Sequence, residues 1–420
     1  MIIEQLYQLY TKHLKISTDT RKLSEGSIFF ALSGPNFNAN EFAESAIEKG
    51  AAYAVISDEK YKKDDRYIVV KNTLQTLQEL SNFHRKHLSM PIIGITGSNG
   101  KTTTKELMYA VLSQHYKTYA TKGNLNNHIG VPLSVLEVNK EHEIAIIEMG
   151  ANKPGDIKEL SEIAEPNFGV ITNIGMAHIE GFGSLEGVIS TKTELYRFLE
   201  KSGVVFLNDT LKHLKEKAVN NKLEIYNTSI LEISNIQTSP FISFDYKREK
   251  VSTKLYGGYN LDNILTAIAI GEYFKVPQEK IIKGLENYVS ENNRSQVITT
   301  KTNTIYLDAY NANPSSMEAA IKNFAEVNTK NKLMILGDML ELGNISNQEH
   351  QKIVSLATEL NITTYFVGNQ FKNCENSTQK FFSTTNNLKE EKILSNLNGF
   401  HILIKGSRGI KLEDIVEDIP

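Results

Sequence analysis

The 420-residue sequence contains one cysteine, no tryptophan and only nine prolines. The single cysteine, Cys374, excludes an intrachain disulfide and any zinc cluster built from cysteines, and such sparse use is typical of a reducing compartment. We therefore expect a cytoplasmic protein. Any metal ion in it would be held by oxygen and histidine ligands.

Long apolar runs and a large excess of one charge are also missing. No segment approaches the roughly 18 consecutive apolar residues that span a bilayer, and residues 1–12 lack the basic start and apolar run of a signal peptide. The 46 basic and 49 acidic residues give a formal net charge of −3, whereas a dedicated nucleic-acid-binding protein needs excess positive charge. We predict no membrane span and no nucleic-acid partner, so that only a local site could bind phosphate.

The pattern of apolar residues predicts an α/β protein. At roughly 150 residues per domain, the length indicates two or three domains. After residue 90, short apolar runs alternate with segments of helical period, which is typical of parallel strands joined by crossover helices. We predict three domains: a small N-terminal α/β domain (1–88), a central domain with a P-loop-type, mostly parallel sheet and flanking helices (89–294), and a Rossmann-like α/β C-terminal domain (295–420).

The same periodicity predicts individual elements. Central strands are expected at 91–96, 143–149, 168–172 and 204–208, and C-terminal strands at 304–308, 332–336, 364–367 and 401–404. Central helices are expected at 102–115, 155–164, 185–199, 262–274 and 278–288. The N-terminal domain should have strands at 26–32 and 51–56, with a helix at 40–49 between them.

The strongest local signal is a glycine-containing loop between a predicted strand and a predicted helix, with the sequence Gly97-Ser98-Asn99-Gly100-Lys101-Thr102-Thr103. In such a loop, backbone N–H groups and the helix dipole face phosphate oxygens, Lys101 reaches the outer phosphates, and the Thr102 hydroxyl can bind Mg²⁺. The match to G-x-x-x-x-G-K-[ST] is imperfect, because Ile95 occupies the position of the first glycine. The strand and helix on either side favour nucleotide phosphate over a structural glycine turn.

Three further residues become candidates for the same site once a phosphate loop is predicted. Glu148 ends a predicted strand, and open α/β sheets bind their ligands at the carboxyl ends of strands. His178 also follows a strand and could bind Mg²⁺ or orient a phosphate, although a lone histidine is more often structural. Lys192 lies on a predicted helix, where an exposed charge is the default interpretation.

The C-terminal domain has three polar loops, each following a predicted strand. They are Asp308-Ala309-Tyr310-Asn311-Ala312-Asn313-Pro314, Gly337-Asp338-Met339-Leu340-Glu341-Leu342-Gly343 and Lys405-Gly406-Ser407-Arg408-Gly409. A helix-capping turn would explain Asn313 or Ser315 but not the whole first run. Three polar loops at strand ends indicate one ligand-facing edge.

Together these runs resemble the Mur ligases, a family of amide-forming enzymes of peptidoglycan synthesis. The resemblance covers the whole chain. Beside the phosphate loop and the first two C-terminal loops, it rests on Ser17-Thr18-Asp19-Thr20-Arg21, Phe29-Phe30-Ala31-Leu32-Ser33-Gly34 and Gly123-Asn124-Leu125-Asn126-Asn127. The phosphate loop marks the family, and the C-terminal runs are more specific to the members that add D-alanyl-D-alanine.

The resemblance implies an ATP-dependent ligase that joins D-Ala-D-Ala to UDP-N-acetylmuramoyl-tripeptide. ATP would phosphorylate the terminal carboxylate of the tripeptide, and the dipeptide amine would attack the acyl phosphate to give the pentapeptide, ADP and phosphate. The N-terminal domain would hold the UDP-sugar, the central domain ATP and two Mg²⁺ ions, and the C-terminal domain would close over ATP and bind the incoming dipeptide. We expect a monomer. The resemblance does not distinguish between diaminopimelate and lysine as the third residue of the tripeptide.

The resemblance also implies roles for individual residues. Lys101, Glu148, His178 and Lys192 would be catalytic, and Thr102, Glu148, His178 and Lys192 would form the metal sites. Lys192 would act as a carbamate made with CO₂, which requires a neutral amine, so burial and neighbouring cations should lower its pKa. ATP would contact Gly97, Ser98, Asn99, Gly100, Lys101, Thr102, Thr103, Asn260, Asn263, Arg294, Asp308 and Tyr310. The other substrates would contact Thr18, Arg21, Ser33, Gly34, Asn124, Asn127, Asn311, Asn313, Lys405, Ser407 and Arg408.

Three places depart from the family pattern. Tyr259 stands where histidine is common, His128 where an acid is common, and residues 38–42 where a loop containing Asp-Gly-His is usual. They change the expected contacts to adenine, peptide and uridine but remove no metal ligand. Alternatives are another Mur-type or a folylpolyglutamate-type ligase, a P-loop NTPase or kinase, and a nucleotide-regulated binding protein. A requirement for an amine co-substrate separates the ligases from the last two.

Overall fold

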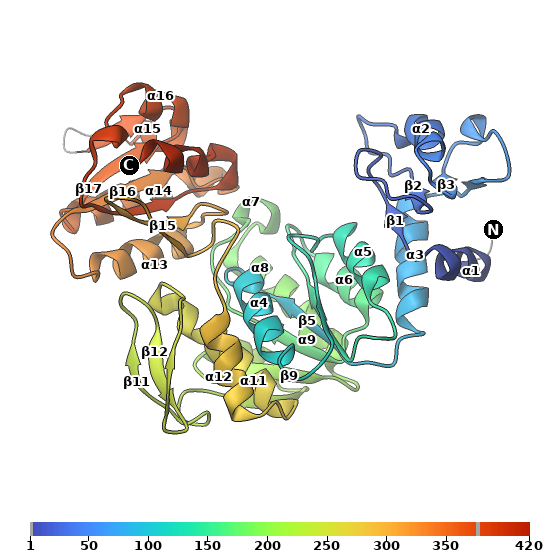
Figure 1. The fold of residues 1–420 in the computed structure, drawn as a ribbon, viewed down its shortest axis with the longest axis horizontal. Coiled ribbons are helices and arrows are strands. Elements are labelled where there is room, and N and C mark those ends of the chain that lie inside the picture. Colours follow the sequence, from blue (N-terminus) through green and yellow to red (C-terminus); the bar gives the residue numbers. More distant parts are fainter. Residues whose placement is uncertain (1–2, 375–378) are drawn as a thin grey trace.

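The computed structural model describes residues 3–374 and 379–420. Within these ranges the strands form four sheets: a parallel N-terminal sheet, a parallel central sheet, a small antiparallel sheet and a mostly parallel C-terminal sheet. Figure 1 shows the N-terminal and C-terminal parts at the two upper ends of the molecule, with the central part below and between them. The predicted α/β class is confirmed.

The N-terminal sheet has the order β1-β2-β3-β4 and is parallel throughout. Its strands are β1 (Ile16–Ser17), β2 (Ile28–Phe30), β3 (Tyr53–Ile56) and β4 (Tyr67–Val69), and its helices are α1 (Ile3–His13), α2 (Ala43–Glu48) and α3 (Thr73–Arg85). The predicted helix at 40–49 begins as a 3₁₀ turn, Ala39–Phe42. Helix α3 joins this part to the central one, since Arg85 Nε donates to the Ala164 carbonyl at 3.0 Å and His84 Nε2 lies 2.7 Å from the Val138 carbonyl.

The central sheet has the order β10-β9-β8-β5-β7-β6, with every pair parallel. Its strands are β5 (Ile92–Thr96), β6 (Thr118–Ala120), β7 (Ile144–Glu148), β8 (Phe168–Ile171), β9 (Val204–Asn208) and β10 (Lys222–Tyr226). Strand β5 lies between β7 and β8, so the chain leaves it toward one side of the sheet and later returns on the other. The loop after β5 is therefore at a topological switch point, where open α/β sheets bind ligands.

Alternate residues of these strands face two separate cores. Ile93 and Ile95 pack in the same core as Leu107 of helix α4 (Lys101–Leu112), together with α11 (Leu261–Tyr273) and α12 (Gln278–Asn287). Ile92 faces the opposite core, which contains α5 (Gly130–Glu137), α6 (Asp156–Ala164), α8 (Leu185–Lys192) and α9 (Glu194–Leu199). Two short helices, α7 (Ile179–Phe182) and α10 (Lys212–Lys217), lie in connections of this part.

The predicted single helix at 185–199 is wrong, because the structure has two helices. Helix α8 ends at Lys192 and α9 begins at Glu194. Thr193 lies between them, and its hydroxyl donates to the Ile189 carbonyl at 2.9 Å. Such a bond to the preceding turn competes with the helical backbone pattern and often bends a helix.

The small antiparallel sheet, β11 (Ile233–Gln237), β12 (Ser243–Tyr246) and β13 (Glu249–Ser252), is absent from the sequence-based prediction. These strands are short and largely polar, so they lack the apolar runs on which strand prediction depends. Lys247 and Arg248 have φ angles of 47° and 70° and form the tight turn between β12 and β13. Phe244 packs into the core around α11 and α12.

The C-terminal sheet has the order β14-β15-β19-β16-β17-β18, and β14 pairs antiparallel with β15. Its strands are β14 (Gln296–Thr299), β15 (Thr304–Asp308), β16 (Lys332–Gly337), β17 (Thr363–Val367), β18 (Lys380–Phe382) and β19 (His401–Lys405). Its helices are α13 (Pro314–Ala325), α14 (Ser346–Glu359), α15 (Asn369–Lys372) and α16 (Thr385–Glu390).

No helix in the described ranges is long and apolar enough to cross a membrane.

The contact between α4 and α12 supplies a test of packing. A Cβ atom at Gly284 would lie 2.5 Å from the Ala110 carbonyl oxygen, which is backbone and cannot move aside. Gly284→Ala should therefore lower the free energy of unfolding by about 1–2 kcal/mol, although alanine is the better helix former. The exposed Lys283→Ala, one position earlier, should change it by less than about 0.5 kcal/mol. Calorimetry of both variants measures this, and equal transition temperatures would contradict the packing argument.

Candidate functional site

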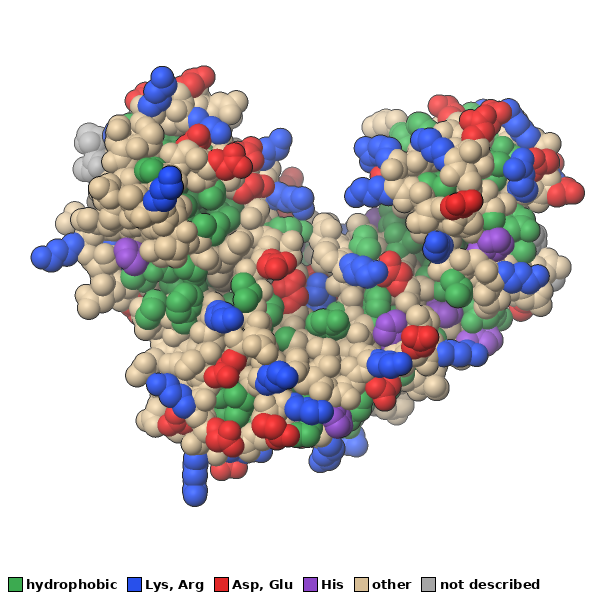
Figure 2. All heavy atoms as spheres, viewed as in Figure 1, with side chains coloured by type: hydrophobic (Ala, Val, Ile, Leu, Met, Phe, Trp, Pro, Cys, Tyr) green, Lys and Arg blue, Asp and Glu red, His purple; other side chains and the backbone are tan. Residues whose placement is uncertain are grey.

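A cavity of about 540 Å³ lies where the carboxyl ends of the central strands face the loops of the C-terminal part. Its walls come from the loop after β5, the end of β7, the start of α11, the loop after β15 and Lys405 at the end of β19. Figure 2 shows the surface hollowed between the N-terminal and C-terminal lobes, with the central part below. Residues that are far apart in the sequence therefore meet at one polar site.

The loop after β5 has the geometry of a phosphate-binding loop. Gly97 has a φ of 145°, and a Cβ atom there would lie 2.0 Å from Thr172 Oγ1, so only glycine fits. Gly100, with a φ of 75°, is the N-cap of α4 and directs the first N–H groups of that helix toward the cavity. Lys101 Nζ donates to the Gly97 carbonyl at 2.8 Å. Burial lowers the pKa of Lys101, Glu148 opposes this shift, and Arg294 adds to it.

Glu148, the last residue of β7, is held against the start of α4. Its Oε1 atom accepts from Asn126 Nδ2 at 2.8 Å and from the Thr102 hydroxyl at 3.2 Å. Its Oε2 atom lies 3.3 Å from Lys105 Nζ but is buried without a hydrogen bond among the described residues. A carboxylate with an unused lone pair beside a threonine hydroxyl is an oxygen donor set that suits Mg²⁺.

Lys105 was missed by the sequence analysis. It lies one helical turn after Lys101, on the same face of α4, and its side chain is only 3% exposed. That i, i+4 spacing was available in the sequence. The sequence alone cannot show, however, that Glu148 lies opposite, because β7 is more than 40 residues away.

Lys192 is buried, with 2% of its surface exposed, so the default interpretation of an exposed charge is wrong for this residue. Its Nζ atom lies 5.5 Å from the centre of the Phe182 ring. Burial and the nearby charge of Lys101 lower the pKa of Lys192 well below its usual value, while Asp156 and Glu194 oppose the shift. Within residues 3–374 and 379–420, no three His, Cys, Asp or Glu side chains form a metal cluster.

His178 follows β8 and lines the cavity with a left-handed φ of 54°. Its Nδ1 atom contacts the carboxylate of Glu341, which comes from the C-terminal part. This contact lowers the pKa of Glu341. The sequence analysis noted the run that contains Glu341 but gave this residue no role.

Two asparagines of the predicted adenine side line the cavity and are hydrogen-bonded to each other. Asn263 Nδ2 donates to Asn260 Oδ1 at 2.7 Å, and Asn263 Oδ1 accepts from the Thr104 hydroxyl at 2.9 Å. These bonds fix the start of α11 against α4. Tyr259, at the position where histidine is common in the family, bonds Ser295 through its hydroxyl at 3.0 Å.

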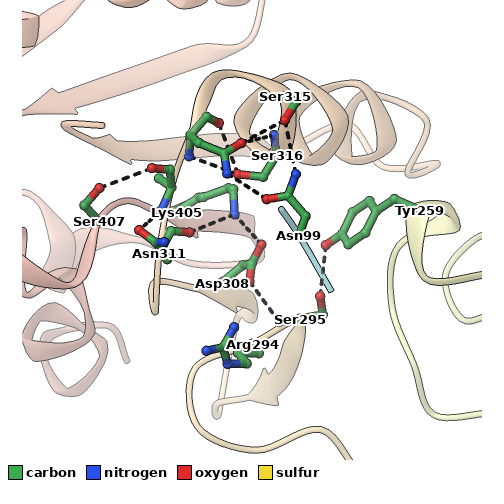
Figure 3. A network of polar contacts seen from close by, with 12 residues as sticks. Asn99, Tyr259, Arg294, Ser295, Asp308, Asn311, Ser315, Ser316, Lys405 and Ser407 are labelled. Carbon is green, nitrogen blue, oxygen red and sulfur yellow. Dashed lines mark hydrogen bonds and ion pairs between the residues drawn. The ribbon is translucent and has the colours of Figure 1, made fainter. Parts of the chain in front are cut away.

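The loops after β15 and β19 meet through a buried ion pair. Lys405 Nζ lies 2.5 Å from Asp308 Oδ2, and Asp308 Oδ1 accepts from the Ser295 N–H at 3.3 Å (Figure 3). Lys405 is only 2% exposed, and the carboxylate of Asp308 compensates its buried charge. The Arg294 guanidinium lies 3.6 Å from the centre of the Tyr310 ring, close enough for a cation–π contact.

The phosphate loop touches the C-terminal part directly. Asn99 Nδ2 donates to the Ser315 hydroxyl at 3.1 Å, and Asn99 Oδ1 accepts from Asn313 Nδ2 at 2.7 Å (Figure 3). Asn313 is also the N-cap of α13, where its Oδ1 atom accepts from the Ser316 N–H. The capping interpretation of Asn313 is confirmed, and the same side chain joins the two parts.

The structure brings together most of the predicted site residues, but not all. Asn124, Asn127 and Asn311 line the cavity. Ser407 lies behind it, accepting from the Leu340 N–H at 3.0 Å, while Arg408 lines a second cavity of about 270 Å³ beside Tyr310. The N-terminal candidates Thr18, Arg21, Ser33 and Gly34 are not among the residues that line the main cavity.

Family models match this chain in three consecutive segments. "Mur ligase family, catalytic domain" matches residues 15–87, "Mur ligase middle domain" matches residues 95–271, and "Mur ligase, glutamate ligase domain" matches residues 293–407. The segments correspond to the N-terminal, central and C-terminal sheets.

Relatives that match nearly the whole chain share one activity. The UDP-N-acetylmuramoyl-tripeptide–D-alanyl-D-alanine ligases of Bacillus subtilis and Buchnera aphidicola (subsp. Baizongia pistaciae) are 34% and 37% identical, each over 96% of this chain and 92% of the relative. A crystal structure of MurF from Acinetobacter baumannii matches with a TM-score of 0.86 at 30% identity, covering 99% of this chain and 98% of that one. MurF of Thermotoga maritima in complex with ADP matches with a TM-score of 0.84 at 26% identity, covering 96% of both chains.

The pair of Lys405 and Asp308 supplies a second test. Lys405→Met should lower the free energy of unfolding by about 3 kcal/mol, because it leaves the Asp308 carboxylate without its cation. The double variant with Asp308→Asn should recover part of that loss. Lys330→Met, at an exposed lysine of the same part, is the control. Calorimetry of the full chain measures all three, and a loss as small as that of the control would contradict the pairing.

Proposed function

The chain belongs to the Mur ligase family, and we propose that the cavity between its central and C-terminal parts is where ATP meets the two substrates that it joins. One observation supports this proposal most strongly. The phosphate loop after β5, the polar loop after β15 and Lys405 at the end of β19 line the same cavity, although more than 200 residues separate the first from the other two.

The activity is that of an ATP-dependent amide ligase, which joins D-Ala-D-Ala to UDP-N-acetylmuramoyl-tripeptide in peptidoglycan synthesis. A carboxylate is a poor acyl donor, so the tripeptide carboxylate first takes the γ-phosphoryl group of ATP. The amine of D-Ala-D-Ala then attacks the acyl phosphate, phosphate leaves, and the amide of the pentapeptide remains. The small molecules that the cavity must accommodate are therefore a nucleotide, a peptide carboxylate and a dipeptide amine.

The central difficulty is that the triphosphate and the tripeptide carboxylate repel each other. We propose that Lys101 and the N–H groups of residues 97–103 neutralise the β- and γ-phosphates. Asn260, Asn263, Arg294, Asp308 and Tyr310, which line the same cavity, would hold the nucleoside side of ATP. A nucleotide phosphate also gives the buried ammonium of Lys101 an anionic partner in place of the loop carbonyl.

Two Mg²⁺ ions would fit residues on the cavity wall. Thr102 and Glu148 would hold one ion, as the Oε2 atom of Glu148, which accepts no hydrogen bond, indicates. His178 on the same wall would hold the other together with a carbamylated Lys192, which is buried 5.5 Å from the Phe182 ring and does not itself line the cavity. When bound, the ions supply positive charge between the phosphate and carboxylate oxygens. The lowered pKa of Lys192 supports its carbamylation, because only a neutral amine reacts with CO₂.

We propose that each of the three domains has a different role in ligand binding. Residues 1–88 would bind the UDP-sugar through Thr18, Arg21, Ser33 and Gly34, residues 89–294 would bind ATP and Mg²⁺, and residues 295–420 would close over ATP. Asn124, Asn127, Asn311, Asn313, Lys405, Ser407 and Arg408 remain the candidates for contacts to the peptide substrates. Asn313 and Lys405 would act there while they keep their contacts to Asn99 and Asp308, whereas Ser407, behind the cavity, would support the loop through the Leu340 N–H. We also propose a monomeric, cytoplasmic enzyme, which agrees with ATP as its substrate and with its single cysteine.

The function is tested by phosphate release from Mg-ATP in the presence of UDP-N-acetylmuramoyl-tripeptide. Release should require D-Ala-D-Ala and should yield the pentapeptide, as detected by mass spectrometry. Lys101→Met should lower the rate roughly 100-fold or more, while Lys62→Met at an exposed N-terminal loop should not change it. Release without any amine would identify an NTPase instead, and release only with a single amino acid would identify another member of the family.

The carbamate is tested by ¹³C NMR with labelled bicarbonate. A carbamate signal should be present at pH 7, because burial lowers the pKa of Lys192 and so increases the share of neutral amine that reacts with CO₂. Lys192→Ala should lose both the signal and most of the activity, whereas Lys201→Ala at an exposed lysine should keep both. A wild-type spectrum without the signal, together with a fully active Lys192→Ala, would contradict the assignment.

A further inference from the structure

The loop of residues 337–343 is held in place from several sides, yet the proposed function gives it no role. The buried carboxylate of Asp338 accepts the N–H groups of Gln370 and Phe371, both at 2.9 Å. The Met339 N–H donates to His350 Nε2 at 3.0 Å. The Leu340 N–H donates to the Ser407 hydroxyl at 3.0 Å. These bonds fix the loop on the C-terminal sheet, so that the next residue, Glu341, has a defined position.

Glu341 extends from this fixed loop across the domain boundary to His178. Its carboxylate contacts His178 Nδ1, and its backbone carbonyl accepts from the Glu180 N–H at 3.4 Å. Both residues of the contact have left-handed backbones, with φ angles of 63° for Glu341 and 54° for His178. This conformation is unfavourable for side chains with a Cβ atom, so it persists only where the surrounding contacts hold it.

Stability alone does not account for this contact. The Glu341 side chain is 55% exposed and that of His178 is 23% exposed. Exposed pairs of this kind contribute little to folding, about 0–1 kcal/mol. The free energy needed to hold two left-handed backbones exceeds the stability that such a pair contributes. The contact is therefore better explained by its effect on the imidazole of His178.

We propose that Glu341 is a positioning residue that fixes the ring and the tautomer of His178. A carboxylate at Nδ1 keeps the proton on that nitrogen and leaves the lone pair on Nε2. In residues 3–374 and 379–420, Nε2 has no hydrogen-bond partner, and His178 lines the main cavity. Nε2 is therefore the nitrogen available to a divalent cation. This inference rests on the proposed role of His178 in holding Mg²⁺.

The contact also links metal binding to the arrangement of the domains. His178 belongs to the central part and Glu341 to the C-terminal part. The histidine is held in the ligating form only while the two parts are docked as they are here. The Asn99 contacts to Asn313 and Ser315 join the same two parts near the phosphate loop, so docking would prepare both the loop and the histidine.

The experiment measures the histidine and the metal separately from turnover. Nitrogen-15 NMR of labelled histidines, with the His178 signals assigned through His178→Gln, reports which ring nitrogen carries the proton. EPR titration with Mn²⁺, in the presence of a nonhydrolysable ATP analogue and UDP-N-acetylmuramoyl-tripeptide, reports metal affinity. Glu359→Gln, at an exposed glutamate of the C-terminal part, is the control.

In the wild type, His178 should carry its proton on Nδ1. Glu341→Ala should mix the tautomers and weaken binding of one Mn²⁺ ion roughly 10- to 100-fold, with little change in the unfolding temperature. Glu341→Gln should restore part of the affinity, because its amide oxygen still accepts the Nδ1 proton. Unchanged His178 signals and unchanged Mn²⁺ affinity in Glu341→Ala would overturn the inference. If His178→Gln itself binds both Mn²⁺ ions normally, the proposed metal role of His178 is wrong, whereas the tautomer measurement still tests the contact with Glu341.

Discussion

The repulsion between two anions, a triphosphate and a carboxylate, is the constraint on which the site depends. The structure meets it by burying cations where the phosphate loop, β7 and α8 come together. The pKa values of Lys101 and Lys192 are both lowered by burial, and the charge of Lys101 lowers that of Lys192 further. Such a cluster is costly to fold without anions, so it is a site prepared for negatively charged ligands. Glu148 offsets part of the charge of Lys101 and, through an Oε2 atom that accepts no hydrogen bond, offers a place for a divalent cation.

The same constraint explains why the site is divided between two parts of the chain. A cavity that must admit a nucleotide and two further substrates cannot be enclosed by one sheet edge, so the C-terminal loops supply the opposite wall. Contacts across the boundary include polar ones, Asn99 with Asn313 and Ser315 and His178 with Glu341. An apolar contact accompanies them, because the buried ring of Tyr256 lies 4.3 Å from that of Tyr306 in the C-terminal core.

Several residues that look like ligand contacts in the sequence are engaged within the protein. Lys405 is paired with Asp308, and Ser407 supports the Leu340 N–H. The conspicuous Asp338 binds two backbone N–H groups at the start of α15. In the polar loops at strand ends, some side chains therefore hold the loop in place, and this allows other side chains to face a ligand. Glu341 is the residue of its loop that reaches across the boundary.

The sequence by itself determined the α/β class, about half of the strands, the phosphate loop and the family. Each of these rests on local pattern, such as the apolar run of β9 at Val204–Asn208 or the Gly-Lys-Thr order at the start of α4, which requires no knowledge of distant contacts. The polar strands β11 to β13 and the break at Thr193 escaped prediction, because their cause is packing against α11 and a single side-chain bond. Only the tertiary structure decided which partners meet: Lys105 with Glu148, and Glu341 with His178. Such pairs join segments more than 40 residues apart, and their meeting is set by strand order and domain docking, which residue spacing does not encode.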